Sequence, residues 1–355
     1  MSTIDRTPHG YALPRQDQLL YAVAGLTARQ LPGAATALAG EVQADMAAAA
    51  PDAGRWLHTA LARQLSGIGG GQDTLAGTRP GDRLWFDFNA AQGRTDGDAY
   101  ASGYGYSRYQ FAIGGDLLHN QMNRFGLGVT YATTSVAPNT GSGTLEEAAP
   151  FLYGQYAFGH ARPVIADALF AYGFTTWRTE RGNPLAATAP LKADASGSNL
   201  HWGVGVRSPV ELGGYTVEPF LRVLWQNSSR GSVGEGTASP AALRLGDYAQ
   251  NGTRLLVGAA AGSGQRDPLQ APITYRASLA FGNDFGDLIY PTVQASLGGQ
   301  PYTIASPHVG RQFAQINLSG TYRVAGSTYA YVGLNGEARE GRLDGSVNAG
   351  VNLKF

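Results

Sequence analysis

The chain has 355 residues, with 50 Gly, 18 Tyr and 13 Phe but no Cys, and its 26 basic residues balance its 26 acidic residues. A neutral chain without a basic tract argues against nucleic acid as a partner. The lack of Cys excludes disulfides and thiolate metal sites. The sequence has no run of about 18 apolar residues, which excludes a transmembrane helix.

Up to about Gly67 the sequence is rich in Ala and has the period of an α-helix. Asp52, which follows Pro51, is expected to cap one helix, and an earlier helix is expected to end at Pro32-Gly33. A glycine-rich segment at 66–71 predicts a flexible joint after the helices. Apolar residues recur four positions apart at Leu38, Val42 and Met46, and again at Leu57, Leu61 and Leu65.

From about Arg83 the apolar period changes to two, as in β-strands. Leu84, Phe86 and Phe88 share one face of the first strand, while Asp87 and Asn89 share the other. Strands of about ten or more residues are typical of outer-membrane barrels. Twelve strands are predicted, at 83–93, 104–117, 123–134, 148–158, 162–178, 196–209, 215–228, 249–261, 272–284, 311–324, 328–337 and 342–355.

The last nine residues, from Val347 to Phe355, alternate apolar and polar without a break. In a closed barrel the apolar face of such a strand meets lipid and the polar face meets a wet lumen. The prediction is an all-β protein, a 12-stranded antiparallel transmembrane β-barrel preceded by helices. Residues 1–30 show no secretory signal pattern. We therefore interpret Met1 as the start of a piece of a longer envelope protein.

The segments between predicted strands alternate in length. Short ones are predicted at Leu118–Met122, Gly159–Ala161, Val210–Gly214 and Ala325–Ser327, and longer ones at Ser135–Glu147, Thr179–Ala195, Ser229–Tyr248 and Phe285–Gly310. Bacterial barrels have short periplasmic turns and long outer loops. This alternation places the C-terminus at Phe355 in the periplasm.

Charged residues at inward positions of the strands are candidate lumen residues. They are Asp87, Arg108, Asp116, Glu218, Arg222 and Arg276. Partners for them on the helical segment are Glu41, Asp45, Arg55 and Arg63. For each pair the alternative is that the two groups are only hydrated. Glycines on the same inward face, such as Gly126 and Gly203, leave room in the lumen.

The order and spacing of several segments over residues 7–355 resemble the C-terminal translocator domain of autotransporters, the type V secretion proteins of Gram-negative bacteria. These segments are Leu38-Ala39-Gly40-Glu41-Val42-Gln43-Ala44, Leu84-Trp85-Phe86, the tract from Gly103 to Asp116, and the C-terminal alternation. The resemblance implies a helical linker over 1–33, a pore plug over 34–71 and the barrel over 83–355. A helix is about 10–12 Å across, so one helix fits the intermediate lumen of twelve strands.

The same resemblance implies that the barrel anchors and carries an upstream passenger across the outer membrane. Its implied partners are outer-membrane lipid, its own passenger, periplasmic chaperones and the barrel assembly machinery, which would read Val351, Leu353 and Phe355 as the assembly signal. We expect a monomer. Some family members cleave themselves between two Asn residues in the pore helix. Residues 1–82 contain no Asn, so that form of cleavage is not expected.

The sequence offers no catalytic, cofactor-binding or metal site. The six His are scattered at 9, 58, 119, 160, 201 and 308, and the nucleophile-elbow and phosphate-loop motifs are absent. Asp284 and Asp287 are interpreted as residues of a solvated turn. We therefore expect a protein that is not an enzyme.

Three other classes of protein share some of these features. A general porin or solute channel has the same kind of barrel but needs an open pore, and the helices before the first strand argue against it. An outer-membrane enzyme would need its catalytic residues outside this chain. A soluble β-sandwich is disfavoured because twelve long apolar faces suit a lipid belt better than a core.

Overall fold

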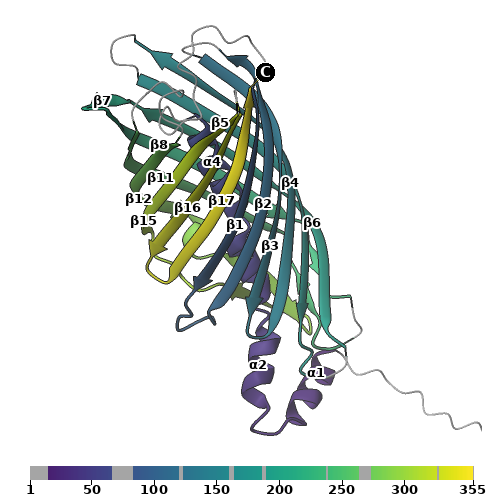
Figure 1. Cartoon of the computed structure of the whole chain (residues 1–355). Helices are drawn as coiled ribbons and strands as arrows, with labels where there is room; N and C mark the ends of the chain where they lie inside the picture. The colour runs from purple at the N-terminus through teal and green to yellow at the C-terminus, as the bar shows by residue number, and fades with distance from the viewer. Residues whose placement is uncertain are drawn as a thin grey trace, which may run out of the picture.

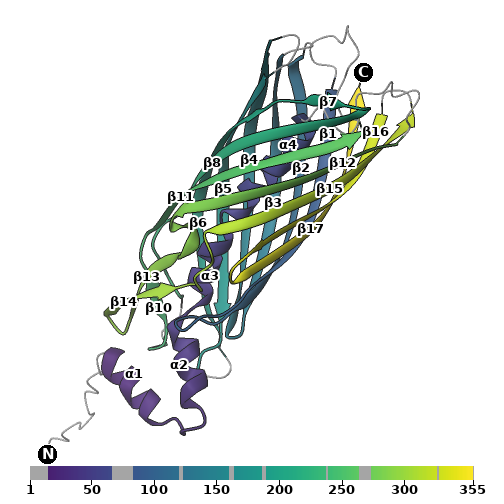
Figure 2. The ribbon, with the colours of Figure 1, turned by 90° about the vertical axis from the view of Figure 1, so that its left-hand side faces the viewer.

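A computed structural model describes residues 15–65, 83–119, 123–159, 164–185, 189–236, 239–263, 273–325 and 328–354. It shows a tall β-barrel with a helical segment along its axis (Figures 1 and 2). The predicted joint at 66–71, the first residues of the strands predicted at 162 and 272, and Phe355 lie outside these ranges. None of the helices in the described ranges is both long and apolar enough to cross a bilayer.

Twelve long antiparallel strands form the barrel, as the sequence predicts. Each pairs with its neighbour in the chain, and β1 pairs with β17 to close the barrel, with Trp85 opposite Asn352 and Thr95 opposite Arg342. A short strand, β7 (Val210–Leu212), adds to the edge of β8. The barrel strands are β1 (Arg83–Thr95), β2 (Tyr104–His119), β3 (Asn123–Pro138), β4 (Gly141–Phe158), β5 (Val164–Arg181), β6 (Leu191–Arg207), β8 (Tyr215–Arg230), β11 (Tyr248–Ser263), β12 (Ile273–Gly286), β15 (Gln312–Ala325), β16 (Thr328–Arg339) and β17 (Arg342–Lys354).

The outer face of the barrel carries a belt of large apolar side chains. On β3 exposed and buried residues alternate, and Phe125, Leu127, Val129 and Tyr131 all point outward. The belt ends at Tyr131, because the later outward-facing residues, Thr133, Ser135 and Ala137, are small or polar. Beyond the belt, exposed ion pairs join Arg178 to Glu146 at 3.0 Å and Lys192 to Glu180 at 2.9 Å. The strands thus continue past the lipid-facing belt as a polar collar.

The belt predicts the positions at which a charged side chain lowers the stability of the barrel. Val129→Arg is expected to lower barrel stability by about 2–4 kcal/mol, because its side chain is 54 % exposed at mid-belt. The matched control is Ser135→Arg on the same face of β3, in the collar, where we expect a loss of about 0–1 kcal/mol. Urea unfolding in lipid vesicles measures both. Equal losses would show that the belt does not face lipid.

Four helices precede the barrel: α1 (Arg15–Ala24), α2 (Leu31–Ala39), α3 (Val42–Ala49) and α4 (Asp52–Leu65). Figure 2 shows α3 and α4 inside the barrel and α1 and α2 outside one end of it. The prediction that a helix ends at Pro32-Gly33 is wrong. The earlier helix ends at Ala24, and Pro32 lies in the first turn of α2, where its missing N–H costs nothing.

A second, four-stranded sheet lies at the end of the barrel where α2 emerges, here called the cap end (Figure 2). The opposite end, where β1 begins, is the C-terminal end. The sheet consists of β9 (Val233–Gly234), β10 (Leu243–Leu245), β13 (Thr292–Leu297) and β14 (Gln300–Ala305), with a short helix, η1 (Asp287–Ile289), before β13. The segments Ser229–Tyr248 and Phe285–Gly310, predicted as loops, therefore contain strands.

The predicted loops Ser135–Glu147 and Thr179–Ala195 are also shorter than expected. β3 and β4 continue until only Asn139 and Thr140 separate them, and β5 and β6 extend to Arg181 and from Leu191. These strands are longer than a bilayer requires, so a prediction based on membrane-spanning length ended them too early.

Candidate functional site

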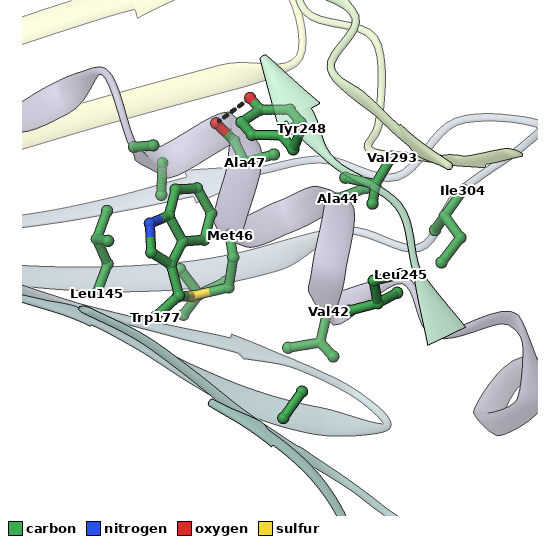
Figure 3. Close-up of a cluster of buried hydrophobic side chains, with 14 of the residues drawn as sticks. Val42, Ala44, Met46, Ala47, Leu145, Trp177, Leu245, Tyr248, Val293 and Ile304 are labelled. Carbon is green, nitrogen blue, oxygen red and sulfur yellow. Dashed lines mark hydrogen bonds between the residues drawn. The ribbon is translucent and has the colours of Figure 1, made fainter. Parts of the chain in front are cut away.

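The lumen at the cap end is closed by α3, which is enclosed by apolar side chains. Val42, Ala44, Met46 and Ala47 of α3 are almost completely buried. Figure 3 shows them between the barrel wall and the small sheet, and Tyr248 donates a hydrogen bond of 3.4 Å to the carbonyl of Ala47. The wall contributes Leu145 and Trp177, and the small sheet contributes Leu245, Val293 and Ile304. This apolar contact seals the mouth against water.

One acidic residue lies within this apolar seal. Asp45 of α3 is fully buried, and its Oδ1 accepts a hydrogen bond of 3.0 Å from Ser306. Its Oδ2 has no hydrogen-bond partner among the described residues. Burial raises the pKa of the Asp45 carboxyl to about 8, against the lowering effect of Ser306, and Glu41 raises it further. α3 lies level with the collar, since it packs on Val136, beyond the end of the belt on β3.

The raised pKa of Asp45 predicts a pH-dependent stability. The folded state holds the proton more tightly than the unfolded state, so the contribution of Asp45 to stability falls as pH rises from about 4 to about 8. Each pKa unit corresponds to about 1.4 kcal/mol, so we expect Asp45→Asn to stabilise the protein by the order of a few kcal/mol at pH 8 and by little at pH 4.

Urea unfolding in detergent between pH 4 and pH 9 tests this, with the exposed Asp194→Asn of β6 as the control. A gain in Asp45→Asn that is the same at both ends of the range would contradict the buried, protonated carboxyl.

The helix α4 packs one apolar side against the barrel wall. Leu57, Leu61 and Leu65 lie on this side and contact Trp85, Phe151, Tyr153 and Leu169 of β1, β4 and β5. Gly54 allows the helix to approach β6, because a Cβ at this position would overlap the His201 ring. Likewise, a Cβ at Gly203 of β6 would overlap the ring of His58 on α4. Of the two glycines predicted on the lumen face, Gly203 therefore makes room for the plug, whereas Gly126 makes room for Tyr153 of the barrel wall.

Three arginines of the barrel hold the last turn of α4. Arg83 and Arg124 donate hydrogen bonds of 3.4 and 3.0 Å to the carbonyl of Gln64, and Arg207 donates one of 2.6 Å to that of Leu65. The carbonyls at a helix C-terminus lack partners within the helix and carry partial negative charge. Barrel side chains therefore cap α4 at the C-terminal end of the barrel.

The first turn of α4 is tied to the last barrel strand by an ion pair. Asp52 lies in this turn, and its carboxylate bonds to Arg55 at 2.8 Å and to Arg342 of β17 at 2.7 Å. Arg342 also contacts the carboxylate of Asp344 at 3.0 Å and donates a hydrogen bond to Tyr106. All these groups are buried. Asp52 therefore links the plug to the wall.

A buried ion pair also fixes α2 where it leaves the barrel. Arg181 of β5 makes two hydrogen bonds of 2.7 Å to Glu235. It also donates hydrogen bonds of 2.6 Å to the carbonyls of Ala37 in α2 and Ala241. The collar, α2 and the segment before β10 thus meet at one guanidinium.

The structure places all six predicted lumen charges inside the barrel. Asp87 pairs with Arg63 of α4 at 3.0 Å, and Asp116 lies 3.3 Å from Arg124 and 3.9 Å from Arg83. Glu218 lies 3.3 Å from Arg207 and 3.8 Å from Arg276. Arg108 lies over the Trp56 ring at 4.8 Å, and Arg222 over the Phe220 ring at 4.4 Å.

The four proposed partners on the helices differ in their contacts. Arg63 meets Asp87, but Arg55 pairs within its own helix with Asp52. Asp45 bonds to Ser306, and the Glu41 carboxylate accepts a hydrogen bond of 3.3 Å from the backbone N–H of Ser102.

One large ion-pair network was missed from the sequence. Arg254 pairs with Asp284 at 2.8 Å and with Glu337 at 2.7 Å, and Arg339 pairs with Asp284 at 2.7 Å and also with Glu337. The interpretation of Asp284 as a residue of a solvated turn is wrong, because β12 continues to Gly286 and Asp284 is fully buried. Its inward position, an even number of residues after Arg276, is the signal that would have placed it in the lumen.

The predicted assembly signal is only partly described. Val351 and Leu353 are half-buried on the outer side of β17, while Asn348 and Asn352 are buried on its lumen side. Phe355 lies outside the described residues. The assembly role of these residues stays a prediction.

A closed antiparallel barrel with an apolar outer belt and a helix along its lumen defines a plugged outer-membrane β-barrel. A family model described as "Autotransporter beta-domain" matches residues 84–335. The chain therefore belongs to the autotransporter beta-domain family, and its place is the outer membrane.

A curated protein and two solved structures are similar to this chain. An extracellular serine protease of Serratia marcescens is 25 % identical over 336 residues, which are 93 % of this chain and 31 % of that protein. The chain thus spans about a third of the length of this curated relative. The translocator domain of the autotransporter NalP from Neisseria meningitidis has a TM-score of 0.69 at 14 % identity, covering 89 % of this chain and 100 % of that domain. The transport unit of AIDA-I from Escherichia coli has a TM-score of 0.59 at 12 % identity, covering 86 % and 99 %. At these identities the two structures show a shared fold.

Proposed function

We propose that this barrel is the translocator and outer-membrane anchor of an autotransporter and carries an upstream passenger to the cell surface. The path of the chain carries the proposal. The end of α4 contacts Arg83 and Arg124 at the C-terminal end of the barrel, and α2 and α1 leave at the cap end (Figure 1). The chain thus passes through its own barrel, and whatever precedes α1 is delivered to the cap-end side.

The orientation and partners follow from the same proposal. The C-terminal end of the barrel faces the periplasm, and the cap end faces outward. Periplasmic chaperones and the barrel assembly machinery receive the chain, with Val351, Leu353 and Phe355 as the assembly signal. The finished protein is a monomer in outer-membrane lipid, with the linker over 1–33 and the barrel over 83–355. Of the plug segment over 34–71, α3 and α4 lie inside the barrel and the last residues of α2 lie outside it (Figure 2).

We propose no catalytic role for this part of the protein. Its buried polar groups hold the plug and the wall together, as Arg342 does for Asp52. An activity such as the one named for the Serratia relative would belong to a passenger.

The second candidate, a solute channel, needs a continuous water path. The described lumen contains α4 with wall contacts along its length, from Asp52 to Leu65. This favours the translocator.

A surface-display experiment tests the proposal. A signal peptide and an epitope tag are placed before residue 1, and the tag is probed with antibody and protease on intact cells. We expect the tag to be accessible, because the path through the lumen ends outside. A tag that stays in the periplasm while the barrel assembles normally would overturn the translocator.

Two further tags fix the orientation. A tag at Asn139–Thr140, between β3 and β4 at the cap end, should be accessible on intact cells. A tag at Ser208–Pro209, between β6 and β7 at the other end, should become accessible only after the outer membrane is opened. The reverse pattern would invert the proposed sidedness.

A further inference from the structure

A small cavity lies beside the plug, on the side of α4 that faces away from its apolar contacts. It provides about 20 Å³ of space for the centre of a water-sized particle. A single water needs about 10–15 Å³ by this measure, so the cavity holds a particle of roughly that size. Its wall contains Arg63 of α4, Arg222 of β8 and Arg276 of β12, together with neutral side chains, and no carboxylate.

The three arginines differ in how closely carboxylates pair with them. Arg63 pairs with Asp87 at 3.0 Å, and Arg276 lies 3.8 Å from Glu218, which is closer to Arg207 at 3.3 Å. No ion pair within 4.0 Å joins Arg222 to a carboxylate in the described part of the chain. Arg222 therefore carries a positive charge at this cavity that has no direct counterion.

The hydrogen-bond donors of the same residues are also incompletely used. Arg222 and Arg276 are 8 % and 7 % exposed, so both are more than nine-tenths buried. Nε and Nη2 of Arg222 and Nε of Arg276 have no hydrogen-bond partner among the described residues. Buried donors without a partner carry a large desolvation cost, particularly on a charged group.

A neighbouring cavity differs in its chemistry. It provides about 30 Å³ and shares Thr59, Arg222 and Gln315 with the first. Its wall also contains Asp52 and Glu337, whose carboxylates are already paired with arginines. Negative charge at that wall disfavours an anion there, so the smaller cavity is the better place for one.

We propose that Arg222 and Arg276, with Arg63 from the plug, form a binding site for one small inorganic anion of halide size between α4 and the barrel wall. A monatomic anion fits the volume, neutralises the charge of Arg222 and accepts hydrogen bonds from the free donors. Space for one or two waters favours a monatomic anion over the carboxylates and phosphates of metabolites. The site bridges plug and wall, so a bound anion stabilises the plugged barrel. The proposed anion site rests on the plugged lumen of the proposed translocator, but it does not require passenger transport.

Bromide provides the test, because it substitutes for chloride and scatters anomalously. In crystals of the intact chain grown with sodium bromide, we expect an anomalous peak between the guanidinium groups of Arg222 and Arg276. Anomalous peaks only at the protein surface, with water in the cavity, would overturn the site.

Thermal unfolding in detergent gives a second readout. At equal ionic strength, potassium bromide should raise the unfolding temperature relative to potassium gluconate, whose anion is too large to enter, by about 2–4 °C. The difference should vanish in Arg222→Gln and shrink in Arg276→Gln. The difference between the two salts should persist in Arg178→Gln, because this arginine lies in the collar with its side chain 54 % exposed.

The two readouts separate the possible failures. If Arg222→Gln does not assemble, Arg276→Gln and the bromide crystals of the unchanged protein still test the anion site. An equal halide effect in all variants would mean a general salt effect and would refute the site. Surface display is measured separately, so loss of the anion site leaves the translocator proposal standing.

Discussion

Deleting residues 1–68 is expected to convert an almost sealed barrel into a conducting one. In the intact chain α3 closes the cap end with apolar contacts, and the cavities described beside α4 have only about 20 and 30 Å³. Removing a helix about 10–12 Å across leaves a water path of similar width. In planar bilayers we expect rare, small openings from the intact protein and a large, steady conductance from the deletion.

A shorter deletion provides the matched control. Removing residues 1–30 takes away α1 but leaves α2, α3 and α4, so conductance should stay low. Cysteine labelling adds a direct view, since the chain has no native Cys. An impermeant maleimide should label Tyr21→Cys, where the side chain is 71 % exposed, and should not label Thr59→Cys. A large conductance in the intact protein that the long deletion leaves unchanged would favour the solute channel.

Arg342→Met is expected to destabilise the barrel by about 3–5 kcal/mol and to loosen the plug. The substitution keeps the volume but leaves Asp52 without its partner on β17 and Asp344 without its contact at 3.0 Å. After the substitution Asp52 keeps only Arg55, and Asp344 loses its arginine, so two buried carboxylates lose compensation by positive charge. The free energy of unfolding in urea measures the first effect, and faster labelling of Thr59→Cys measures the second.

The control for this substitution is Arg94→Met. Arg94 pairs with Asp96 at 3.0 Å, but the two side chains are 77 % and 60 % exposed. An exposed pair of this kind contributes less than about 1 kcal/mol. Equal losses in the two variants, or a plug that stays protected in Arg342→Met, would show that the link from Asp52 to β17 does not hold α4.

The barrel was predictable because its signal is local and repeated. Side chains on β3 and on β12 up to Phe281 alternate between the outer face and the lumen, so the sequence alone shows which face these residues take. The inward positions of Glu218 and Arg276 follow from the same alternation. Closure of β1 on β17 follows from the need of a membrane sheet to have no free edge.

The cap end was not predictable in this way. β9 and β10 contain two and three residues, and β13 and β14 contain six each. Their apolar residues face α3 rather than lipid, so they show no membrane-length alternation. Asp284 was misplaced for a related reason, because its Gly- and Asn-containing surroundings have the composition of a turn although they continue β12.

The position of the plug depends on contacts between distant residues. The pairing of Asp52 with Arg342 spans 290 residues, and that of Arg63 with Asp87 spans 24. The period of Leu57, Leu61 and Leu65 predicts a helix with one apolar side, but it does not say which strands that side meets. Trp85 and Phe151 provide the answer only once the barrel is closed.

The small sheet at the cap end implies an order of assembly. Leu245, Val293 and Ile304 of this sheet bury their side chains against α3, so the sheet has little to fold onto until α3 has reached the mouth. The last part of the molecule to become ordered is thus the part that closes behind the threaded chain. The sheet also holds α2, because Tyr302 of β14 donates hydrogen bonds to the carbonyls of Leu38 and Ala39. We therefore expect folding of the small sheet to close the cap end over α3 and to hold the plug in place.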